Sequence, residues 1–406
     1  MKVLQINSVC GIRSTGRIAT DIHQLLTDQG HESVIAYGQL DPKNCDRTIK
    51  VGNQKDINIH GVISRVFDRH GFGSKKATED FLRRVEEYGP DLIHLHNIHG
   101  YYLHVGLLFD YIKNKKIPVV WTLHDCWSFT GHCAYFDFAG CSKWQSECHN
   151  CPQKKSYPAS LFLDQSRRNY QDKKEIFNGV KDLSFVTPSY WLRGLLKESY
   201  LSSYDAYVIN NGIDLDTFKP RKSSFRKKHQ LDESFVMLMV SSEWTNRKGL
   251  QYLVRFNETL KSNEKIVLVG LTEELKKSLP DSMVKITKTD NIEELAEIYA
   301  SCDVLINPTL EDNFPTTNLE ALACGTPVIT FNTGGSPEAV DEETGKVIPQ
   351  GDLSALREAV EEIKHLGKGH YEEKARARAL DRYHRQDRYQ DYIALYEKIV
   401  NRSKQK

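Results

Sequence analysis

Long apolar segments are absent from this chain, because no run approaches the roughly 18 residues that a membrane-spanning helix needs. An excess of charge is absent as well, since 55 Lys and Arg residues balance 54 Asp and Glu residues to a formal charge of +1. Binding to a phosphate backbone draws on a positive excess, so we expect no nucleic-acid partner. The apolar segment at the N-terminus is too short for a signal peptide, which predicts a cytoplasmic protein.

Internal repeats and low-complexity segments are also missing, and aromatic residues make up 10% of the chain, which argues against disorder. The 406 residues suffice for two domains of ordinary size. With 39% hydrophobic residues, the chain can build a core in each of them. Composition therefore predicts a soluble globular protein with two domains.

The first half of the chain alternates short apolar segments with amphipathic ones, which predicts strands separated by helices. The expected strands are residues 2–6, 33–37, 91–95, 118–123, 183–186 and 206–209. A loop with two glycines, residues 11–16, is expected between the first strand and a helix whose apolar face includes Ile18 and Ile22. Strands that alternate with helices in this way form parallel sheets covered on both faces.

A turn signal at residues 210–212 and a polar stretch at 219–224 separate this half from a second alternating series. The expected strands of that series are residues 236–240, 265–269, 303–306 and 327–331. The pattern predicts two Rossmann-like α/β domains, residues 1–210 and 211–385, and a helical, highly charged tail from 371 to 399. Ligands of open parallel sheets bind beyond the carboxyl ends of the strands, so we expect the site in the cleft between two facing domains.

The segment from Leu310 to Pro327 carries the most informative chemistry, because Asp312 and Glu320 flank the start of a helix expected near Thr316. A carboxylate in the loop can accept hydrogen bonds from sugar hydroxyls, and one two turns into the helix can bind the paired hydroxyls of a ribose. Free amides at the start of the helix can hold a pyrophosphate. Taken alone, the two carboxylates are explained equally well as a loop residue and a surface helix residue.

The whole segment, with Thr333 to Glu338, resembles the acidic-x7-Glu region of retaining glycosyltransferases of the GT-B fold, in glycosyltransferase family 4. Arg247-Lys248-Gly249, His124-Asp125-Cys126-Trp127 and the junction from Asn211 to Pro220 resemble further motifs of this family, in the family's order. Residues 94–101 and 124–152 resemble the colanic-acid and capsule-type transferases within it. The resemblance implies an acceptor-side first domain, a donor-binding second domain, and a helix at 386–406 that packs back on the first.

Roles for the acidic and basic residues follow from the resemblance. Glu320 would hold the nucleotide ribose, and Asp312 would contact the donor sugar, where the family usually has the longer Glu. Arg247 and Lys248 would stabilise the negative charge that develops on the departing diphosphate. Many members carry a further Arg six residues before this Lys, and Ser242 stands there instead.

The other implied site residues lie in loops and at helix starts. His124 would hydrogen-bond the donor sugar at a strand end, whereas a lone His would more often be a buried residue satisfied by backbone. The expected donor-binding residues are Gly16, Asn313, Phe314, Pro315, Thr316, Thr317 and Glu320. The expected acceptor-side residues are Arg13, Ser14, Thr15, His96 and Asn97.

The implied reaction is retaining transfer of a hexose from a UDP- or GDP-sugar to a glycan or lipid-linked acceptor in surface polysaccharide synthesis. Catalysis would rest on positioning and charge stabilisation, with no cofactor required. Two alternatives remain open: a sugar-nucleotide epimerase of related fold, and a non-catalytic nucleotide-sugar-binding protein.

Five of the nine cysteines fall between residues 126 and 151. The spacings of Cys133, Cys141, Cys148 and Cys151 allow a structural zinc site, in which the Cys148-x2-Cys151 pair resembles the end of a zinc knuckle. Reduced thiols in a folded insertion, residues 126–152, explain the same residues equally well. Cys126 is expected simply to be packed.

Residues 60–85 interleave basic and apolar side chains, among them Arg65, Arg69, Val62 and Phe67. The pattern is typical either of a surface that meets anionic lipid headgroups or of an ordinary solvated helix with salt bridges. We expect peripheral contact with the inner face of the cell membrane, because polymer-building members of the resembled family often use lipid-linked acceptors.

Overall fold

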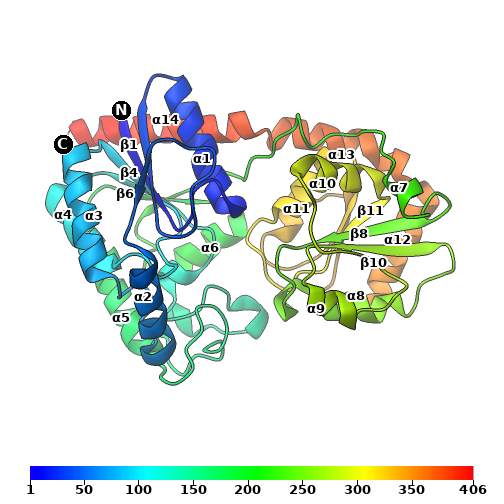
Figure 1. The fold of residues 1–406 in the computed structure, drawn as a ribbon, viewed down its shortest axis with the longest axis horizontal. Coiled ribbons are helices and arrows are strands. Elements are labelled where there is room, and N and C mark those ends of the chain that lie inside the picture. Colours follow the sequence, from blue (N-terminus) through cyan, green and yellow to red (C-terminus); the bar gives the residue numbers. More distant parts are fainter. Residues whose placement is uncertain (406) are drawn as a thin grey trace. The chain divides into compact units, whose positions relative to one another are not determined.

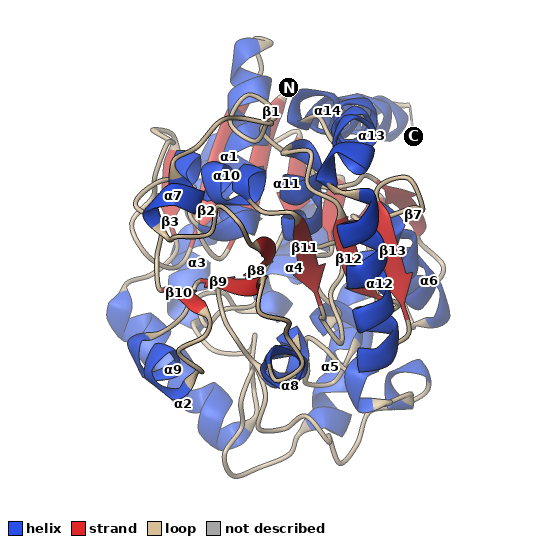
Figure 2. Cartoon of the chain, turned by 90° about the vertical axis from the view of Figure 1, so that its right-hand side faces the viewer, coloured by secondary structure: helices blue, strands red, loops and turns tan. Residues whose placement is uncertain are grey.

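The computed structural model describes residues 1–405 and divides into two compact units. The N-terminal unit comprises Met1–Asn210 together with the chain from Arg388 onward, and the C-terminal unit comprises Asn211–Asp387. Each unit is a parallel sheet with helices on its faces (Figures 1 and 2). Within residues 1–405, no helix combines the length and the apolar character needed to cross a bilayer.

The sheet of the N-terminal unit has seven parallel strands in the order β3-β2-β1-β4-β5-β6-β7. They are β1 Lys2–Asn7, β2 Glu32–Tyr37, β3 Thr48–Lys50, β4 Leu92–Leu95, β5 Val119–Thr122, β6 Leu183–Thr187 and β7 Asp205–Val208. The helices are α1 Arg13–Asp28, α2 Gln54–Phe67, α3 Lys75–Tyr88, α4 Val105–Lys115, α5 Ser166–Phe177 and α6 Tyr190–Glu198. Between β5 and α5 lie three short 3-10 helices, Trp127–Phe129, Asp137–Ala139 and Lys143–Gln145.

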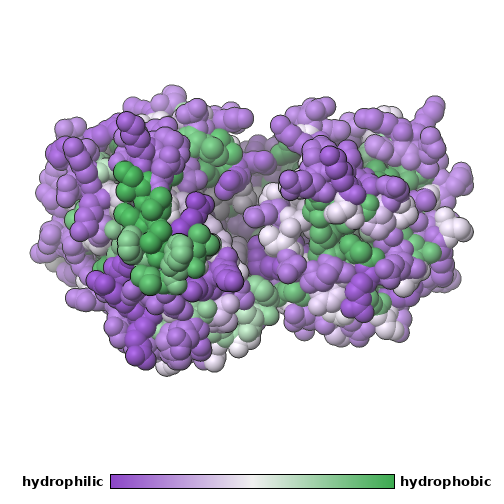
Figure 3. Space-filling view, turned by 60° about the horizontal axis from the view of Figure 1, so that its bottom comes forward, coloured by the Kyte–Doolittle hydropathy of each residue, from purple (hydrophilic) through white to green (hydrophobic). Residues whose placement is uncertain are grey.

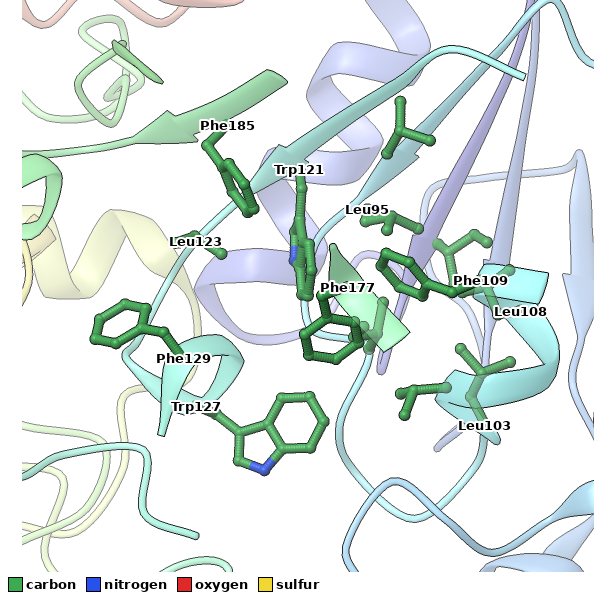
Figure 4. Close-up of a cluster of buried hydrophobic side chains, with 14 of the residues drawn as sticks. Leu95, Leu103, Leu108, Phe109, Trp121, Leu123, Trp127, Phe129, Phe177 and Phe185 are labelled. Carbon is green, nitrogen blue, oxygen red and sulfur yellow. The ribbon is translucent and has the colours of Figure 1, made fainter. Parts of the chain in front are cut away.

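Aromatic residues fill the core on one face of this sheet (Figure 4). Trp121, on the interior strand β5, packs edge-on against Phe177 of α5, with ring centroids 4.9 Å apart, and stacks on Phe185 of β6 at 5.5 Å. Trp127 also contacts Phe177, at 6.3 Å. The aromatic cluster therefore ties the chain that follows β5 to the sheet.

The sheet of the C-terminal unit has six parallel strands in the order β10-β9-β8-β11-β12-β13. They are β8 Phe235–Val240, β9 Glu264–Val269, β10 Val284–Ile286, β11 Val304–Asn307, β12 Val328–Phe331 and β13 Gly345–Ile348. The helices are α7 Phe225–Lys228, α8 Leu250–Asn257, α9 Glu273–Ser278, α10 Ile292–Ser301, α11 Thr316–Ala323, α12 Leu353–Leu366 and α13 Lys368–Arg382. Two 3-10 helices, Asn246–Lys248 and Ser336–Ala339, lie in the loops after β8 and β12.

The last helix, α14 Arg385–Lys404, belongs almost wholly to the N-terminal unit. Its apolar face is buried with Val3, Ile22 and Val120 in one cluster. The buried residues that α14 contributes to this cluster are Tyr389, Tyr392, Ile393, Leu395, Tyr396, Ile399 and Val400. The tyrosine hydroxyls also find partners, since Tyr396 hydrogen-bonds His94 Nδ1 at 2.6 Å.

All ten expected strands are present, with ends that differ by a residue or two. Three edge strands were not predicted, namely β3, β10 and β13, because each has only three or four residues and contains Lys. The helical tail is confirmed, but it is two helices, α13 and α14, which are interrupted at Tyr383 and His384 where the chain pairs with Ile213.

Candidate active site

Each sheet has one point at which the strand order reverses direction, and open α/β sheets bind ligands beyond the strand ends at such points. In the N-terminal unit the reversal lies between β1 and β4, and in the C-terminal unit it lies between β8 and β11. Sequence-predicted residues follow all four of these strands. The two switch points are described separately below.

In the C-terminal unit, the loops after β8 and β11 are bound directly to each other. The backbone N–H of Leu310 donates to Arg247 O at 2.7 Å, and Arg247 Nη1 donates back to Glu311 O at 2.5 Å. Gly249 follows with a left-handed φ of 76°, and a Cβ there would lie 2.0 Å from Pro308 O. Only glycine fits this close approach, which fixes Arg247 and Lys248 over the end of β11.

Lys248 and Asp312 form an ion pair in which both side chains are largely buried. Burial alone would raise the pKa of Asp312, but the charges of Lys248 and Arg247 outweigh it and hold that pKa below its usual range. The carbonyl of Asp312 accepts from Gly335 N at 2.9 Å, and a Cβ on Gly334 would lie 2.2 Å from it. The predicted acidic residue is therefore ionised and held from both sides.

Helix α11 begins at Thr316, as predicted, directly after the extended residue Pro315. Within the described chain no side chain caps its N-terminus. The N–H of Asn318 donates to Pro315 O at 3.2 Å, whereas the amides of Thr316 and Thr317 keep their capacity for an anion. The half-buried Thr316 and Thr317 belong to this turn. The buried Phe314 packs against Tyr383, with ring centroids 5.9 Å apart.

The position of Glu320 differs from the prediction. It is the fifth residue of α11, so it stands about one turn into the helix rather than two. Its Oε2 accepts a hydrogen bond of 2.8 Å from the hydroxyl of Tyr299, a buried residue of α10. Sequence reasoning missed Tyr299, because nothing in its helical pattern separates a core tyrosine from one that holds a site carboxylate.

Asn318 is a second residue that sequence reasoning missed, and its side chain is buried. Its Nδ2 donates to Ser336 O at 3.1 Å, and its Oδ1 accepts from Asn307 Nδ2 at 2.8 Å. The neighbouring Asn313 is buried as well, and its backbone N–H donates to Asp312 Oδ1 at 2.9 Å. Asn318 therefore joins α11 to β11 and to the loop after β12.

In the N-terminal unit, His96 and His124 follow the adjacent strands β4 and β5. They share a hydrogen bond of 3.1 Å between His96 Nδ1 and His124 Nε2, and His96 Nε2 lies 3.2 Å from Gln5 Oε1. Burial lowers the pKa of His124 to about 4, with Asp125 opposing the shift and His99 adding to it. The imidazole of His124 is therefore neutral at physiological pH, available for hydrogen bonding but not as a fixed charge.

Asp125, beside His124, accepts from His99 Nε2 and from Trp127 N, each at 2.9 Å. Burial would raise the pKa of Asp125, but His99 and these hydrogen bonds lower it. The other nitrogen of His99 contacts the hydroxyl of Tyr157 at 2.9 Å. His99 and Tyr157 thus tie the segment after β5 to the loop after β4, a role for His99 that was not predicted.

The expected loop at residues 11–16 is shorter than predicted, because α1 begins at Arg13. Arg13, Ser14, Thr15 and Gly16 therefore form its first turn, with Arg13 and Ser14 exposed. The early start is possible because Gly16 is buried against Val9 and the backbone of residue 11, where a Cβ would be crowded.

Asn7, the last residue of β1, is the residue that connects this turn to the loop after β4. Its Oδ1 accepts from Asn97 N at 3.2 Å, and its Nδ2 lies 3.4 Å from Thr15 Oγ1. The predicted acceptor-side residues Thr15, His96 and Asn97 thus gather at the switch point of this sheet.

The four predicted metal ligands line one small cavity in the segment between β5 and α5. Their sulfur atoms, however, do not form a group of three within 4.8 Å of one another. Within residues 1–405 such a group is formed instead by His23, Cys45 and Asp46. Cys126 is buried in the aromatic core, as expected. All nine cysteines are free thiols.

Two regions of the chain match known families. Residues 15–217 match the family described as Glycosyltransferase Family 4, and residues 234–365 match the one described as Glycosyl transferases group 1. The chain is 26% identical over 370 residues to the putative colanic acid biosynthesis glycosyl transferase WcaC of Escherichia coli, covering 88% of this chain and 89% of that protein. It is 21% identical over 384 residues to an uncharacterized 41.2 kDa protein in the cps region of Klebsiella pneumoniae, covering 92% and 98%.

Solved structures of the same fold include sucrose-phosphate synthase from Thermosynechococcus elongatus, with a TM-score of 0.73, 18% identity, and coverage of 99% of this chain and 100% of that one. Anabaena HepE in complex with UDP gives a TM-score of 0.70 at 16% identity, covering 98% and 100%. The protein thus has the GT-B fold, and it is a glycosyltransferase. By the family matches across both units, it belongs to glycosyltransferase family 4.

Proposed function

We propose that this protein transfers a hexose from a nucleoside diphosphate sugar to a glycan or lipid-linked acceptor, with retention of configuration at the anomeric carbon. The observation that carries the proposal is the arrangement around the start of α11. Asp312, which pairs with Lys248, precedes the first-turn amides of Thr316 and Thr317 in the chain, and Glu320 lies about one turn into the helix. A cation, an anion-binding helix start and a carboxylate match a diphosphate with a ribose attached.

The proposed chemistry is stabilisation of the leaving group. Breaking a glycosyl–phosphate bond places negative charge on the diphosphate, and Arg247, Lys248 and the amides of α11 supply fixed positive charge and N–H donors for it. The departing phosphate oxygen accepts the proton of the acceptor hydroxyl on the same face of the sugar, which retains the configuration. Asp312 holds the Lys248 ammonium in place and offers a second oxygen to a sugar hydroxyl.

The names of two relatives support a role in surface polysaccharide synthesis. WcaC is named for colanic acid biosynthesis, and CapM of Staphylococcus aureus, 26% identical over 166 residues, is named for capsular polysaccharide biosynthesis. The donor-binding part of the proposal is supported by solved structures of Anabaena HepE with UDP and with UDP-glucose. We propose a UDP- or GDP-sugar as the donor here.

Catalysis is proposed to need no bound cofactor. Asp214 and Asp216 have the Asp-x-Asp spacing of some metal-dependent transferases, but the Asp214 carboxylate already has hydrogen-bond and ion-pair partners within the unit. It accepts from Thr217 Oγ1 at 2.9 Å and from Asp216 N at 3.1 Å, and it lies 3.4 Å from Arg385. These bonds fix the start of the C-terminal unit.

A donor screen by thermal stabilisation tests the proposal. UDP-, GDP-, dTDP- and ADP-sugars are added to wild type, to Glu320→Ala and to the control Glu274→Ala, an exposed residue of α9. A donor at a hundred times its dissociation constant should add roughly 2.7 kcal/mol of stability. We expect one nucleotide class to stabilise wild type and the control but not Glu320→Ala. No response to any donor would contradict the proposal, and release of an epimerised nucleotide sugar without acceptor would favour an epimerase.

We also propose that the N-terminal unit contacts the inner face of the cell membrane through an exposed apolar patch. We define the α2 patch as Ile59, Val62, Phe67, Leu161, Phe162 and Leu163, all of them exposed. Its two parts are joined because Leu161 N donates to Arg65 O, near the end of α2, at 2.8 Å. Figure 3 shows hydrophobic side chains gathered on this unit.

The two arginines expected in this region, Arg65 and Arg69, have different surroundings. Arg69 pairs with Asp172 at 2.7 Å and lies over the ring of Phe72 at 3.8 Å, so it is committed within the unit. Arg65 remains exposed beside the patch. Burial of aromatic and aliphatic side chains next to such a cation is typical of binding to anionic interfaces.

Co-sedimentation with vesicles tests the membrane contact. Wild type should sediment with phosphatidylglycerol vesicles, and Phe162→Ser should reduce the bound fraction several-fold. Leu380→Ser, which changes an exposed leucine in the C-terminal unit, is the matched control. Equal sedimentation of all three proteins, or sedimentation that ignores lipid charge, would contradict the proposal.

A further inference from the structure

The segment from residue 130 to 152 is buried in part but has little regular structure. Its only helical elements are two 3-10 turns of three residues each, Asp137–Ala139 and Lys143–Gln145. Even so, Phe136 and Trp144 are buried side by side, with ring centroids 4.9 Å apart. Small structural units with little core of their own often use a disulfide or a metal to hold one conformation.

The side chains of this segment surround a single cavity of about 10 Å³, which is room for one water-sized occupant. Cys133, Cys141, Cys148 and Cys151 all line it. Cys133 and Cys151 are close enough for their side chains to share a hydrogen bond. Four thiols around one small space are the donor set that zinc prefers in closed structural sites.

A buried histidine also points to an occupant of this cavity. The His132 side chain is fully buried, and its Nδ1 lies 2.5 Å from Asp68 Oδ1. Its other nitrogen, Nε2, has no hydrogen-bond partner among residues 1–405, although His132 lines the same cavity. An unpaired buried nitrogen is costly, and a histidine oriented by a carboxylate is a recurrent partner of metal centres.

Further groups around the cavity suit a cluster of thiolates. The backbone N–H of Gly131 donates to Cys148 Sγ at 3.2 Å. Lys173 is buried with its Nζ donating to Trp127 O at 2.5 Å. N–H donors such as that of Gly131 offset part of the net charge of −2 that four thiolates and Zn²⁺ would carry.

We propose that Cys133, Cys141, Cys148 and Cys151 bind one structural Zn²⁺ as four thiolates in tetrahedral geometry. Each thiol releases its proton to solvent as its Zn–S bond forms, so four protons leave for each ion bound. Within the described chain, no three of these sulfurs lie within 4.8 Å of one another, so binding draws them together around the ion. His132, as an imidazolium whose Nδ1–H is held by Asp68, then donates its Nε2–H to one of the bound thiolates.

The proposed zinc would have a structural role and would take no part in catalysis. The segment begins directly after Trp127–Phe129, which follows His124 and Asp125. Beyond Cys151 it continues to Tyr157, whose hydroxyl contacts the His99 that holds Asp125. Zinc would therefore fix both ends of the chain that positions these two residues at the switch point of the N-terminal sheet.

Metal analysis of untagged protein, purified without chelator, tests the assignment. We expect about one zinc per chain in wild type and at least a fivefold loss in Cys148→Ser. Cys45→Ser is the matched control, because it changes the other candidate ligand group, whose third member Asp46 is 93% exposed on its side chain. Zinc retained in Cys148→Ser but lost in Cys45→Ser would place the metal at that group and overturn the proposal.

A measurement on wild type alone guards against a variant that fails to fold. Cobalt exchanged into the site should give the strong sulfur-to-cobalt absorption and the visible bands of a tetrahedral four-thiolate centre. Four of the nine thiols should react with a thiol reagent only after a chelator is added. Absence of zinc and of these cobalt bands, or a Cys133–Cys151 disulfide found in freshly purified protein, would overturn the proposal. None of these readouts depends on transfer activity, so they stand apart from the test of donor binding.

Discussion

The hydroxyl of Tyr299 donates a hydrogen bond of 2.8 Å to Glu320 Oε2, joining α10 to the carboxylate proposed to hold the ribose. Burial, and then the neighbouring Glu320 charge, raises the pKa of Tyr299 well above its usual value, so the phenol stays protonated as the donor. One oxygen of Glu320 is thereby oriented by the core of the C-terminal unit. The ribose contact thus depends on a residue outside the recognisable motif.

Tyr299→Phe removes this donor and keeps the packing of the ring. Because hydrogen bonds to charged groups contribute roughly 1.5–3 kcal/mol, we expect binding of the preferred nucleoside diphosphate to weaken by about tenfold or more. Isothermal titration calorimetry measures the change. Tyr371→Phe, a change at another buried tyrosine of the same unit, should leave affinity unaltered. Equal affinity of Tyr299→Phe and wild type would show that Glu320 needs no such support.

Lys248→Met tests the proposed diphosphate contact. The variant removes the cation that pairs with Asp312, so we expect affinity for the nucleoside diphosphate to fall at least tenfold. Affinity for the bare nucleoside should stay within twofold, because it carries no phosphate. Lys276→Met, at a lysine near the end of α9, serves as control. A parallel loss of nucleoside and diphosphate binding would instead indicate a general collapse of the loop.

Structural features that local sequence signals mark were predicted. Contacts between residues that are distant in the sequence were not. The start of α11 near Thr316 was predicted because it belongs to one continuous motif that follows the strand expected at residues 303–306. The contact of Tyr299 with Glu320 was not, since it joins residues 21 positions apart on two helices. The early start of α1 at Arg13 was missed for a similar reason, because glycines at residues 11 and 16 suggest a loop until the packing against Val9 is known.

Acid should destabilise the C-terminal unit through Glu264, the buried first residue of β9. Its carboxylate accepts from Lys364 Nζ at 2.8 Å and from Arg357 Nη1 at 2.9 Å. Burial would raise the pKa of Glu264, but these cations and a backbone N–H lower it to about 2. Because the folded pKa lies below the unfolded value of 4.5, the stabilisation is complete above pH 4.5 and is lost as pH falls towards 2.

Glu264→Gln should therefore lower the free energy of unfolding by up to about 3 kcal/mol at pH 7, and by progressively less as pH falls below 4.5. Urea unfolding at several pH values, followed by fluorescence, measures the difference. Glu258→Gln, at an exposed residue that follows α8, is the control and should track wild type throughout. A deficit that does not shrink in acid would mean that Glu264 contributes by packing rather than by charge.

The last helix should stabilise the N-terminal unit specifically, because the apolar face of α14 is buried there. Tyr396 is fully buried and its hydroxyl contacts His94 Nδ1 at 2.6 Å, so Tyr396→Ala removes both a large aromatic ring and the partner of a buried histidine. Substitutions of this size in a core typically cost about 3–5 kcal/mol. Calorimetry should show the transition of the N-terminal unit shifting to lower temperature while that of the C-terminal unit stays in place. Tyr396→Phe, which keeps the ring, should lose only a fraction of this stability. If both transitions moved together in Tyr396→Ala, the two units would unfold as one cooperative body, and α14 would be part of what couples them.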